Sequence, residues 1–203
     1  MKSRFKVLGH PAHPLLVVFP LAFYPVAALA EVLYLLLTGA FGYHNADTVL
    51  NIDVGFLWRA GFWLQAIGLL GNLGAALPGL VDWFNIPNDA PSKDKATFHM
   101  TTGLTLAGLS VLSLLLLNWG VPPAGWTLPQ DLWLFVCVGL NIFNGLILAG
   151  FQGWLGGELV YRHGIGVEQT DAIDPIAVTP GAVTPGAGPV QDSVLAGTRV
   201  PPQ

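Results

Sequence analysis

Charged side chains are scarce in this chain. Asp, Glu, Lys and Arg make up 10% of its 203 residues, whereas 53% are hydrophobic. Average soluble proteins carry about 25% charged residues, so this chain lacks the side chains to cover a water-facing surface. The shortage argues against a soluble globular protein, and the lack of a basic patch argues against nucleic-acid binding. The composition instead predicts one membrane domain.

Cysteine pairs and the common catalytic motifs are also missing. Cys137 is the only cysteine and lies in an apolar run, which excludes an intrachain disulfide and a CxxC pair. The sequence has no Gly-rich phosphate-binding loop and no Ser/His/Asp arrangement. No catalytic residue can be named, and whether the chain is an enzyme is left open. Any chemistry must come from its few other polar side chains.

Four long apolar runs stand in place of these features. A helix that spans a bilayer needs about 20 apolar residues, and each run is long enough. We therefore expect transmembrane helices at about residues 15–37, 56–83, 96–119 and 132–159. Small residues recur in the second and fourth runs, Gly71 and Gly153 among them, and let helix backbones approach closely in lipid. The predicted fold is all-α, a four-helix transmembrane bundle with up-down-up-down order.

The chain divides into a membrane domain over residues 1–166 and a tail over residues 167–203. The tail is rich in Pro, Gly and Ala and has no aromatic residue, so we expect it to be disordered. Of the eight Lys and Arg residues, only Arg59 falls on the side opposite both termini. Basic residues favour the cytoplasmic side of a membrane, which predicts that both termini are cytoplasmic.

Two histidines stand directly before the first apolar run, in the stretch Gly9-His10-Pro11-Ala12-His13-Pro14. A residue that precedes proline is disfavoured in the helical region, so we expect His10 and His13 to be extended. Pro14 then suits the first position of the helix. The stretch predicts two imidazoles held on a stiff backbone at the membrane edge.

Alternating helix directions bring further polar residues to this edge. His99 begins the third helix, and His163 follows the fourth. Neutral imidazole suits zinc, copper, iron and nickel, and haem iron takes axial histidines. We expect haem b or a transition metal to bind here, at His10, His13, His99 and His163. Asp82 and Glu158 lie at the same level and are expected to orient these ligands. In the alternative interpretation, the histidines only form hydrogen bonds with neighbouring groups or lipid headgroups.

Other polar residues lie inside the apolar runs. Glu31 and Arg59 fall at a similar depth near the far side, which predicts an ion pair. Asn72, Asn141 and Asn144 fall near the middle of the membrane and predict hydrogen bonds between helices. A transport path is the alternative interpretation of these residues. Glycines that are expected to leave room for a flat macrocycle near the histidines are Gly103, Gly153, Gly156 and Gly157.

Several of these motifs together resemble one family. They are Gly9–Pro14, Gly79–Asp82, His99 at the start of the third helix, and Gly153–Gly164. They are similar to the bacterial family of small four-helix membrane proteins with an HPxHP signature and no assigned function, over roughly residues 8 to 166. Relatives are sometimes fused to Rieske-type iron–sulfur domains. The resemblance implies the bacterial inner membrane and redox work, but no defined reaction.

Three functions follow. The first is a haem- or metal-binding protein that takes part in membrane electron transfer, as the cytochrome-like part of a redox system. The second is an accessory subunit of a larger membrane complex without a cofactor, and the third is a small transporter. The expected partners are the lipid bilayer and a redox protein or larger membrane complex, with no nucleic acid.

Overall fold

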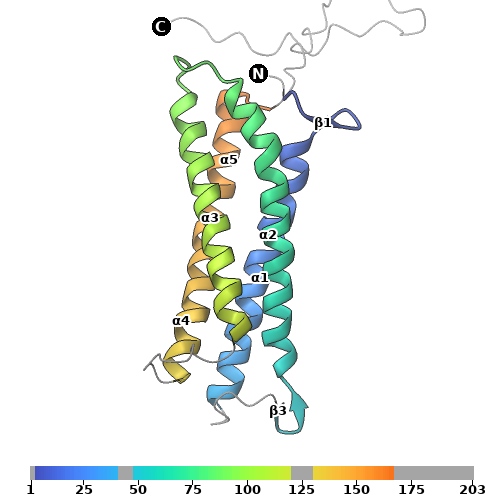
Figure 1. Cartoon of the computed structure of the whole chain (residues 1–203), viewed down its shortest axis with the longest axis vertical. Coiled ribbons are helices and arrows are strands. Elements are labelled where there is room, and N and C mark those ends of the chain that lie inside the picture. The colour runs from blue at the N-terminus through green and yellow to red at the C-terminus, as the bar shows by residue number, and fades with distance from the viewer. Residues whose placement is uncertain (1–2, 41–47, 120–129, 167–203) are drawn as a thin grey trace, which may run out of the picture. The chain divides into compact units, whose positions relative to one another are not determined.

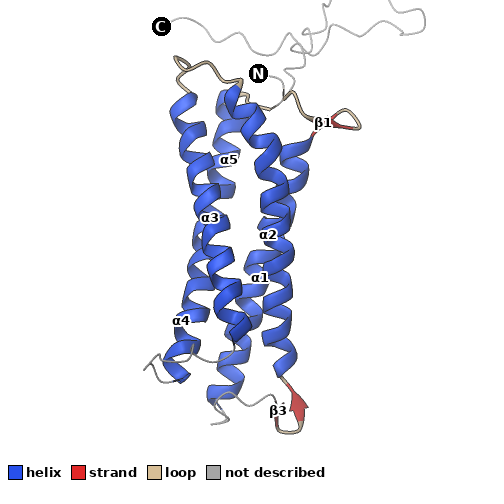
Figure 2. Ribbon diagram, in the orientation of Figure 1, coloured by secondary structure: helices blue, strands red, loops and turns tan. Residues whose placement is uncertain are grey.

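The computed structural model describes residues 3–40, 48–119 and 130–166. Within them, four long helical segments run side by side, and each is long and apolar enough to cross a membrane (Figures 1 and 2). They are α1 (Ala12–Ala40), α2 (Gly55–Phe84), α3 (Lys93–Trp119), and a last segment made of α4 (Gln130–Ile142), the π-helical η1 (Phe143–Leu148) and α5 (Ala149–His163). The predicted all-α four-helix bundle is therefore confirmed. The predicted tail and His44 lie outside the described residues.

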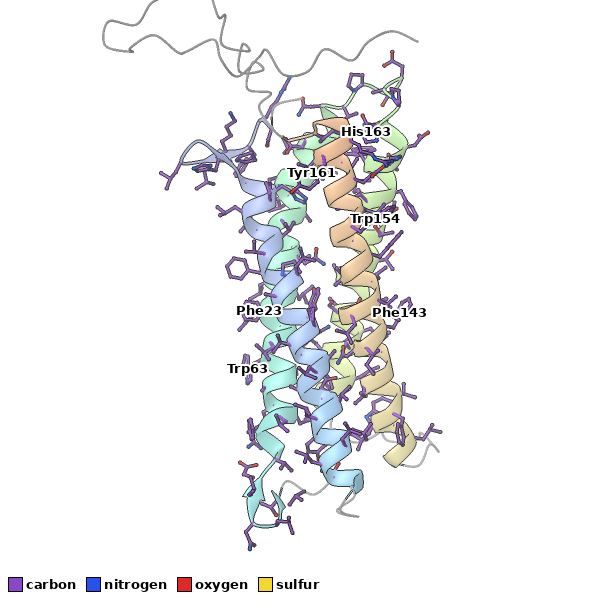
Figure 3. The ribbon with its side chains drawn as sticks, turned by 180° about the vertical axis from the view of Figure 1, so that it is seen from behind. Phe23, Trp63, Phe143, Trp154, Tyr161 and His163 are labelled. Carbon is purple, nitrogen blue, oxygen red and sulfur yellow. The ribbon has the colours of Figure 1, made fainter. Side chains whose placement is uncertain are left out.

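The length of the helices matches a bilayer. The 29 residues of α1 rise about 1.5 Å each and span roughly 43 Å, close to a bilayer with its headgroup regions. The outer surface of the bundle is apolar, and Trp63, Phe143 and Trp154 point away from it (Figure 3). Trp63 and Trp154 are 65% and 62% exposed. Such a surface suits hydrocarbon rather than water.

The two ends of the bundle carry different connections. One end of the bundle carries the hairpin of strands β1 (Lys6–Val7) and β2 (His10–Pro11), the α2–α3 connection and the end of α5. We call this the basic end, because Lys6, Lys93, Lys95 and Arg162 belong to its elements. At the opposite end, strands β3 (Thr48–Val49) and β4 (Ile52–Asp53) form a second hairpin that leads into α2.

Glycines let α1 and α2 pack closely. A Cβ atom at Gly68 would lie 2.6 Å from the Tyr24 ring, and one at Gly71 would lie 2.3 Å from Cβ of Phe19. No side chain larger than hydrogen fits at such distances without a shift of the neighbouring helix. The prediction that small residues in the second helix permit close packing is confirmed.

The start of α1 differs from the prediction. The helix begins at Ala12, so His13 lies in its first turn and Pro14 follows within that turn. Proline is tolerated there because the first backbone N–H groups of a helix have no helical partner. The expected extended conformation is therefore wrong for His13, whereas His10 is extended in β2.

Candidate functional site

His13 is the better anchored of two histidines that meet inside the basic end. Its Nδ1 lies 2.8 Å from the carbonyl oxygen of Ala75 on α2. A carbonyl only accepts, so Nδ1 carries the proton and Nε2 keeps its lone pair. The ring lies against Gly79, where a Cβ atom would be 2.8 Å from Nδ1. Gly79 therefore makes room for the imidazole on the surface of α2.

His99, in the second turn of α3, faces His13. The ring centroids are 5.9 Å apart and the rings are nearly perpendicular, at 82°. Gln152 of α5 donates to the His99 carbonyl oxygen at 2.9 Å, and its Nε2 lies 3.4 Å from His99 Nε2. The Nδ1 atom of His99 is buried and has no hydrogen-bond partner. Each ring of this histidine pair thus has a nitrogen that no hydrogen bond occupies.

The other two predicted ligands lie elsewhere. His10 is exposed on the β1–β2 hairpin. His163 ends α5 and lines a surface pocket of the α2–α3 connection together with Asn85 and Ser92 (Figure 3). Within the described ranges, no three or more His, Cys, Asp or Glu side chains gather in a way that could hold a metal. The predicted cluster of four histidines is therefore reduced to the pair His13 and His99.

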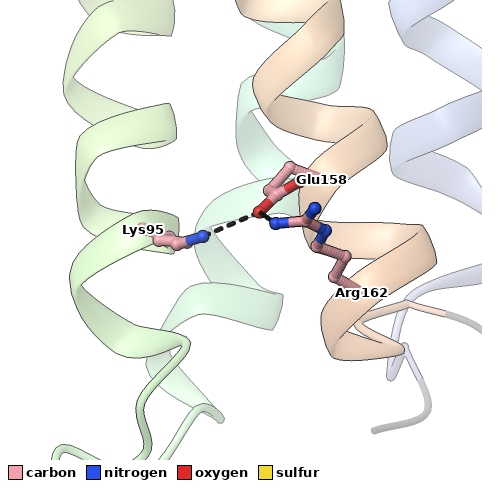
Figure 4. A network of polar contacts seen from close by, with 3 residues as sticks. All are labelled: Lys95, Glu158 and Arg162. Atoms are coloured by element: carbon pink, nitrogen blue, oxygen red, sulfur yellow. Dashed lines mark hydrogen bonds and ion pairs between the residues drawn. The ribbon is translucent and has the colours of Figure 1, made fainter.

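The two carboxylates expected to orient the ligands have other partners. Asp82 accepts hydrogen bonds from the Ser3 hydroxyl at 2.8 Å and from the backbone N–H of Arg4 at 3.2 Å. Glu158 accepts from Lys95 at 2.7 Å and from Arg162 at 3.1 Å (Figure 4). Both carboxylates lie at the basic end, where their partners are a serine hydroxyl, a backbone N–H and two cationic side chains. They hold the connections of the basic end together.

The predicted ion pair between Glu31 and Arg59 does not form. Arg59 pairs with Asp53 at 2.9 Å, with both side chains more than half exposed. Glu31 is fully buried and accepts a hydrogen bond from Asn141 Nδ2 of α4 at 2.5 Å. A pair at the water-exposed helix end avoids the desolvation that a buried pair would require, which explains the choice of partner.

A set of polar side chains occupies the interior between Glu31 and the histidine pair. We call it the polar column; its members are Tyr24, Glu31, Gln65, Asn72, Ser110, Ser113, Asn141 and Asn144, and all are buried. Asn141 accepts from Ser113 of α3, and one turn along, Asn144 donates to Ser110 at 2.8 Å. These two rungs join α3 to the last helical segment in the middle of the bundle.

The column continues from these rungs toward the basic end. The Tyr24 hydroxyl approaches Ser110 and Asn72 without hydrogen-bond geometry to either. Asn72 Nδ2 donates to the Gly103 carbonyl oxygen at 3.4 Å. A Cβ atom at Gly103 would lie 2.8 Å from Nε2 of Gln152, the residue that also contacts His99. Side chains from all four helical segments thus link the level of Glu31 to the histidine pair.

Comparison with known proteins agrees with this architecture. A family model described as "Predicted membrane protein (DUF2231)" matches residues 9–169. The chain belongs to this family. The match begins at Gly9, directly before the HPxHP motif, and runs past the end of α5, so it covers all four helical segments. No curated protein and no solved structure matches the chain. This DUF2231 protein is thus an integral, multi-pass membrane protein, as its sequence predicted.

Sequence reasoning found part of the polar column in the DUF2231 chain. The hydrogen bonds predicted for Asn72, Asn141 and Asn144 are confirmed. Tyr24, Gln65, Ser110 and Ser113 were not predicted, and Gln152 was not either. For the two serines on α3, the sequence does carry a signal, which is their spacing. One face of α3 carries residues that recur every three to four positions: His99, Thr102, Leu106, Ser110 and Ser113. The polar content of that face becomes visible only when its members are considered together.

Proposed function

We propose that this protein binds a transition-metal ion between His13 and His99 and that the site serves membrane electron transfer. The observation that carries the proposal is the spacing of the two rings, 5.9 Å between centroids. Two imidazoles bound to one metal at about 2.0–2.1 Å, with each ring centre roughly 1 Å behind its nitrogen, have centroids about 5–6.5 Å apart. The observed spacing lies within this range.

The hydrogen bonds of the pair also support ligation. Histidines that bind metals usually donate their other N–H to a carbonyl or carboxylate, which fixes the tautomer and the direction of the ring. The bond from His13 Nδ1 to the Ala75 carbonyl oxygen is of this kind and leaves Nε2 to bind. On His99, Nδ1 is buried without a partner, but the Gln152 amide nitrogen beside Nε2 can only donate, which puts the ring proton on Nδ1. Binding at Nδ1 therefore requires this proton to move to Nε2 and the Gln152 amide to turn. A metal ion would satisfy both nitrogens.

The surroundings of the pair favour a single ion over haem b. The glycines predicted to leave room for a macrocycle are covered by protein side chains: Gln152 lies against Gly103, and Leu21 lies against Gly153. Haem between the rings would require these side chains to move, whereas a single ion would not. Imidazole suits zinc, copper, iron and nickel. Electron transfer restricts the choice to copper or iron, with the remaining coordination positions filled by water or a small ligand.

The same proposal includes a location and a partner. The described Lys and Arg residues belong to elements of the basic end except Arg59, and by the positive-inside rule this supports a cytoplasmic location of this end in a bacterial inner membrane. The histidine pair would then lie near the cytoplasmic surface. A redox protein or a larger membrane complex that docks at the basic end would exchange electrons with the metal.

The test is metal analysis of purified protein. We expect stoichiometric metal in the wild type and in His163→Ala, a matched control that removes a histidine of the same end outside the pair. His99→Ala should lose at least about tenfold in metal affinity, because an outer partner alone is already worth 10–100-fold. Absence of metal after incubation with copper, iron, zinc and nickel salts would overturn the proposal. A Soret band in the visible spectrum would instead show that the bound group is haem.

A further inference from the structure

We propose that the bundle contains a transmembrane proton path in which Glu31 is the proton-binding site. The path consists of the polar column, which includes Glu31, and of Thr102 and Gln152 beside the histidine pair, with water molecules between the polar groups. On the far side Glu31 reaches the solution past the apolar cluster of Tyr34, Val49 and Val54, which must admit water when the proton is exchanged. It moves protons down an electrochemical gradient, and no bond other than O–H and N–H is made or broken. The proposal does not depend on metal binding at the histidines.

Glu31 has the surroundings of a group that binds and releases a proton. It is fully buried, and Oε1 has no hydrogen-bond partner. Among the described residues, its contacts on the other helices are uncharged: Gly61 of α2 lies against it, Asn141 and the nearby Cys137 thiol come from α4, and Ser113 of α3 bonds to Asn141. A buried carboxylate without a cation is costly, so burial favours the neutral acid. Glu31 therefore binds and releases its proton without a charged neighbour in the described part of the chain.

The chemistry around Glu31 favours a proton over a metal cation. Ca²⁺ takes six to eight oxygen ligands, often several carboxylates, and Mg²⁺ needs a near-ideal octahedron. Glu31 is the only acidic side chain of the polar column, and Oε2 already accepts a hydrogen bond from Asn141. The backbone of α2 presses against the carboxyl group, since a Cβ atom at Gly61 would lie 2.8 Å from Oε1. A proton needs neither further ligands nor space.

The polar column is incompletely bonded along its length. Besides Glu31 Oε1, buried polar atoms without partners are both amide atoms of Gln65, Oδ1 of Asn144 and the Tyr24 hydroxyl. Buried polar groups in native proteins nearly always have partners, and exceptions call for water, an ion or a functional role. These atoms come from α1, α2 and the η1 segment, and they lie in the same interior. They give water molecules donors and acceptors between Glu31 and the histidines.

Groups able to pass a proton recur along the way. Hydroxyl groups both donate and accept, and the column supplies those of Ser113, Ser110 and Tyr24. At the basic end, the Thr102 hydroxyl donates to Gln152 and extends this series as far as the histidine pair. The amides of Asn72, Asn141 and Asn144 orient these groups. Intramembrane acidic residues are known members of proton relays.

The experiment measures proton flux into liposomes that contain the full-length protein and a trapped pH indicator. A potassium gradient with valinomycin provides the driving potential. We expect wild-type flux several-fold above that of protein-free vesicles and a fall to the protein-free rate in Glu31→Gln. The carboxamide oxygen of Gln still accepts from Asn141, so the change preserves the helix contacts. Glu158→Gln, which alters a carboxylate outside the column, should retain the wild-type flux.

Three results of the flux experiment would overturn the proposal. They are wild-type flux equal to that of protein-free vesicles, an unchanged flux in Glu31→Gln, and a flux that follows a sodium gradient instead of the proton gradient. Infrared spectroscopy of the wild type provides a measurement that needs no folded variant. We expect a protonated carboxyl band that shifts in D₂O and disappears at alkaline pH. A buried carboxyl group that never changes protonation would also exclude the path.

Discussion

The buried charged groups of the basic end and the side chains of the polar column are bonded to different extents. At the basic end each buried charge is fully engaged: Asp82 accepts from Ser3 and Arg4, and Lys93 donates to two carbonyl oxygens. In the column, Glu31 and Gln65 are more deeply buried, yet both have atoms without partners. Complete networks rigidify a structure, whereas incomplete ones lower its stability. The difference indicates that the basic end holds the helices and that the column serves function at a cost in stability.

Lys93→Met should have the largest effect on stability. The Lys93 ammonium donates to the Trp83 and Ile86 carbonyl oxygens at 2.8 and 3.2 Å and lies 3.8 Å from the centroid of the Trp83 ring. Loss of charged hydrogen bonds and of the cation–π contact should lower the free energy of unfolding by about 2–4 kcal/mol. Denaturant unfolding in detergent checks this. Lys95→Met, at an exposed lysine two residues away, is the control. Equal losses in both variants would contradict the tight engagement of Lys93.

The chain's composition and the length of its apolar runs predicted the fold, because bilayer thickness leaves few alternatives for four such runs. Alternating helix directions also placed His13 and His99 at one level, where their rings meet. Depth alone does not determine which way a side chain points. His10 lies exposed on a hairpin, and His163 lines a pocket of the α2–α3 connection. Glu31 and Arg59 share a depth but not a face, which explains why their predicted pair is wrong.

The polar column was harder to predict for a different reason. Ser, Tyr and Gln occur singly in many transmembrane helices, where each can satisfy itself on its own backbone. Ser110 does so by donating to the Leu106 carbonyl oxygen. Ser110 becomes part of the polar column through Asn144, which lies 34 positions away in the sequence and donates to the Ser110 hydroxyl oxygen. Such contacts depend on the rotation of each helix about its axis, which apolar runs of this kind do not determine.

Asp82→Ala should have a smaller, more local effect. The Asp82 carboxylate is the group that ties Ser3 and Arg4 to α2. Removal of a buried acceptor leaves its donors without a partner at a cost of about 1–3 kcal/mol. We expect faster protease cleavage near the N-terminus, measured by mass spectrometry of the fragments. Asp94→Ala, an exposed acidic change in the first turn of α3, should leave the cleavage rate unchanged. Equal protection in both variants would show that Asp82 does not hold this segment.

Gln65→Met tests the column directly. Neither amide atom of this buried side chain has a partner in the protein, so an apolar side chain of similar length removes a polar group without breaking a bond within the protein. We expect the free energy of unfolding to stay equal or to rise by about 1 kcal/mol. Asn141→Leu is the matched comparison, because it breaks the bonds to Glu31 and Ser113 and should destabilise. Destabilisation by Gln65→Met to the same extent would mean that this amide is bonded after all, and the contrast with the basic end would weaken.

Arg162→Ala should have the smallest effect. Its guanidinium is largely exposed, with 74% of the side chain accessible, and it shares Glu158 Oε1 with Lys95 (Figure 4). Exposed ion pairs contribute little and are screened by salt. We expect a change in melting temperature close to the reproducibility of the measurement, and none at high salt. Because Lys95 still engages the carboxylate after the substitution, the basic end should keep its structure. A large loss of stability that persists at high salt would show that this pair belongs to the tightly bonded network and not to its solvated edge.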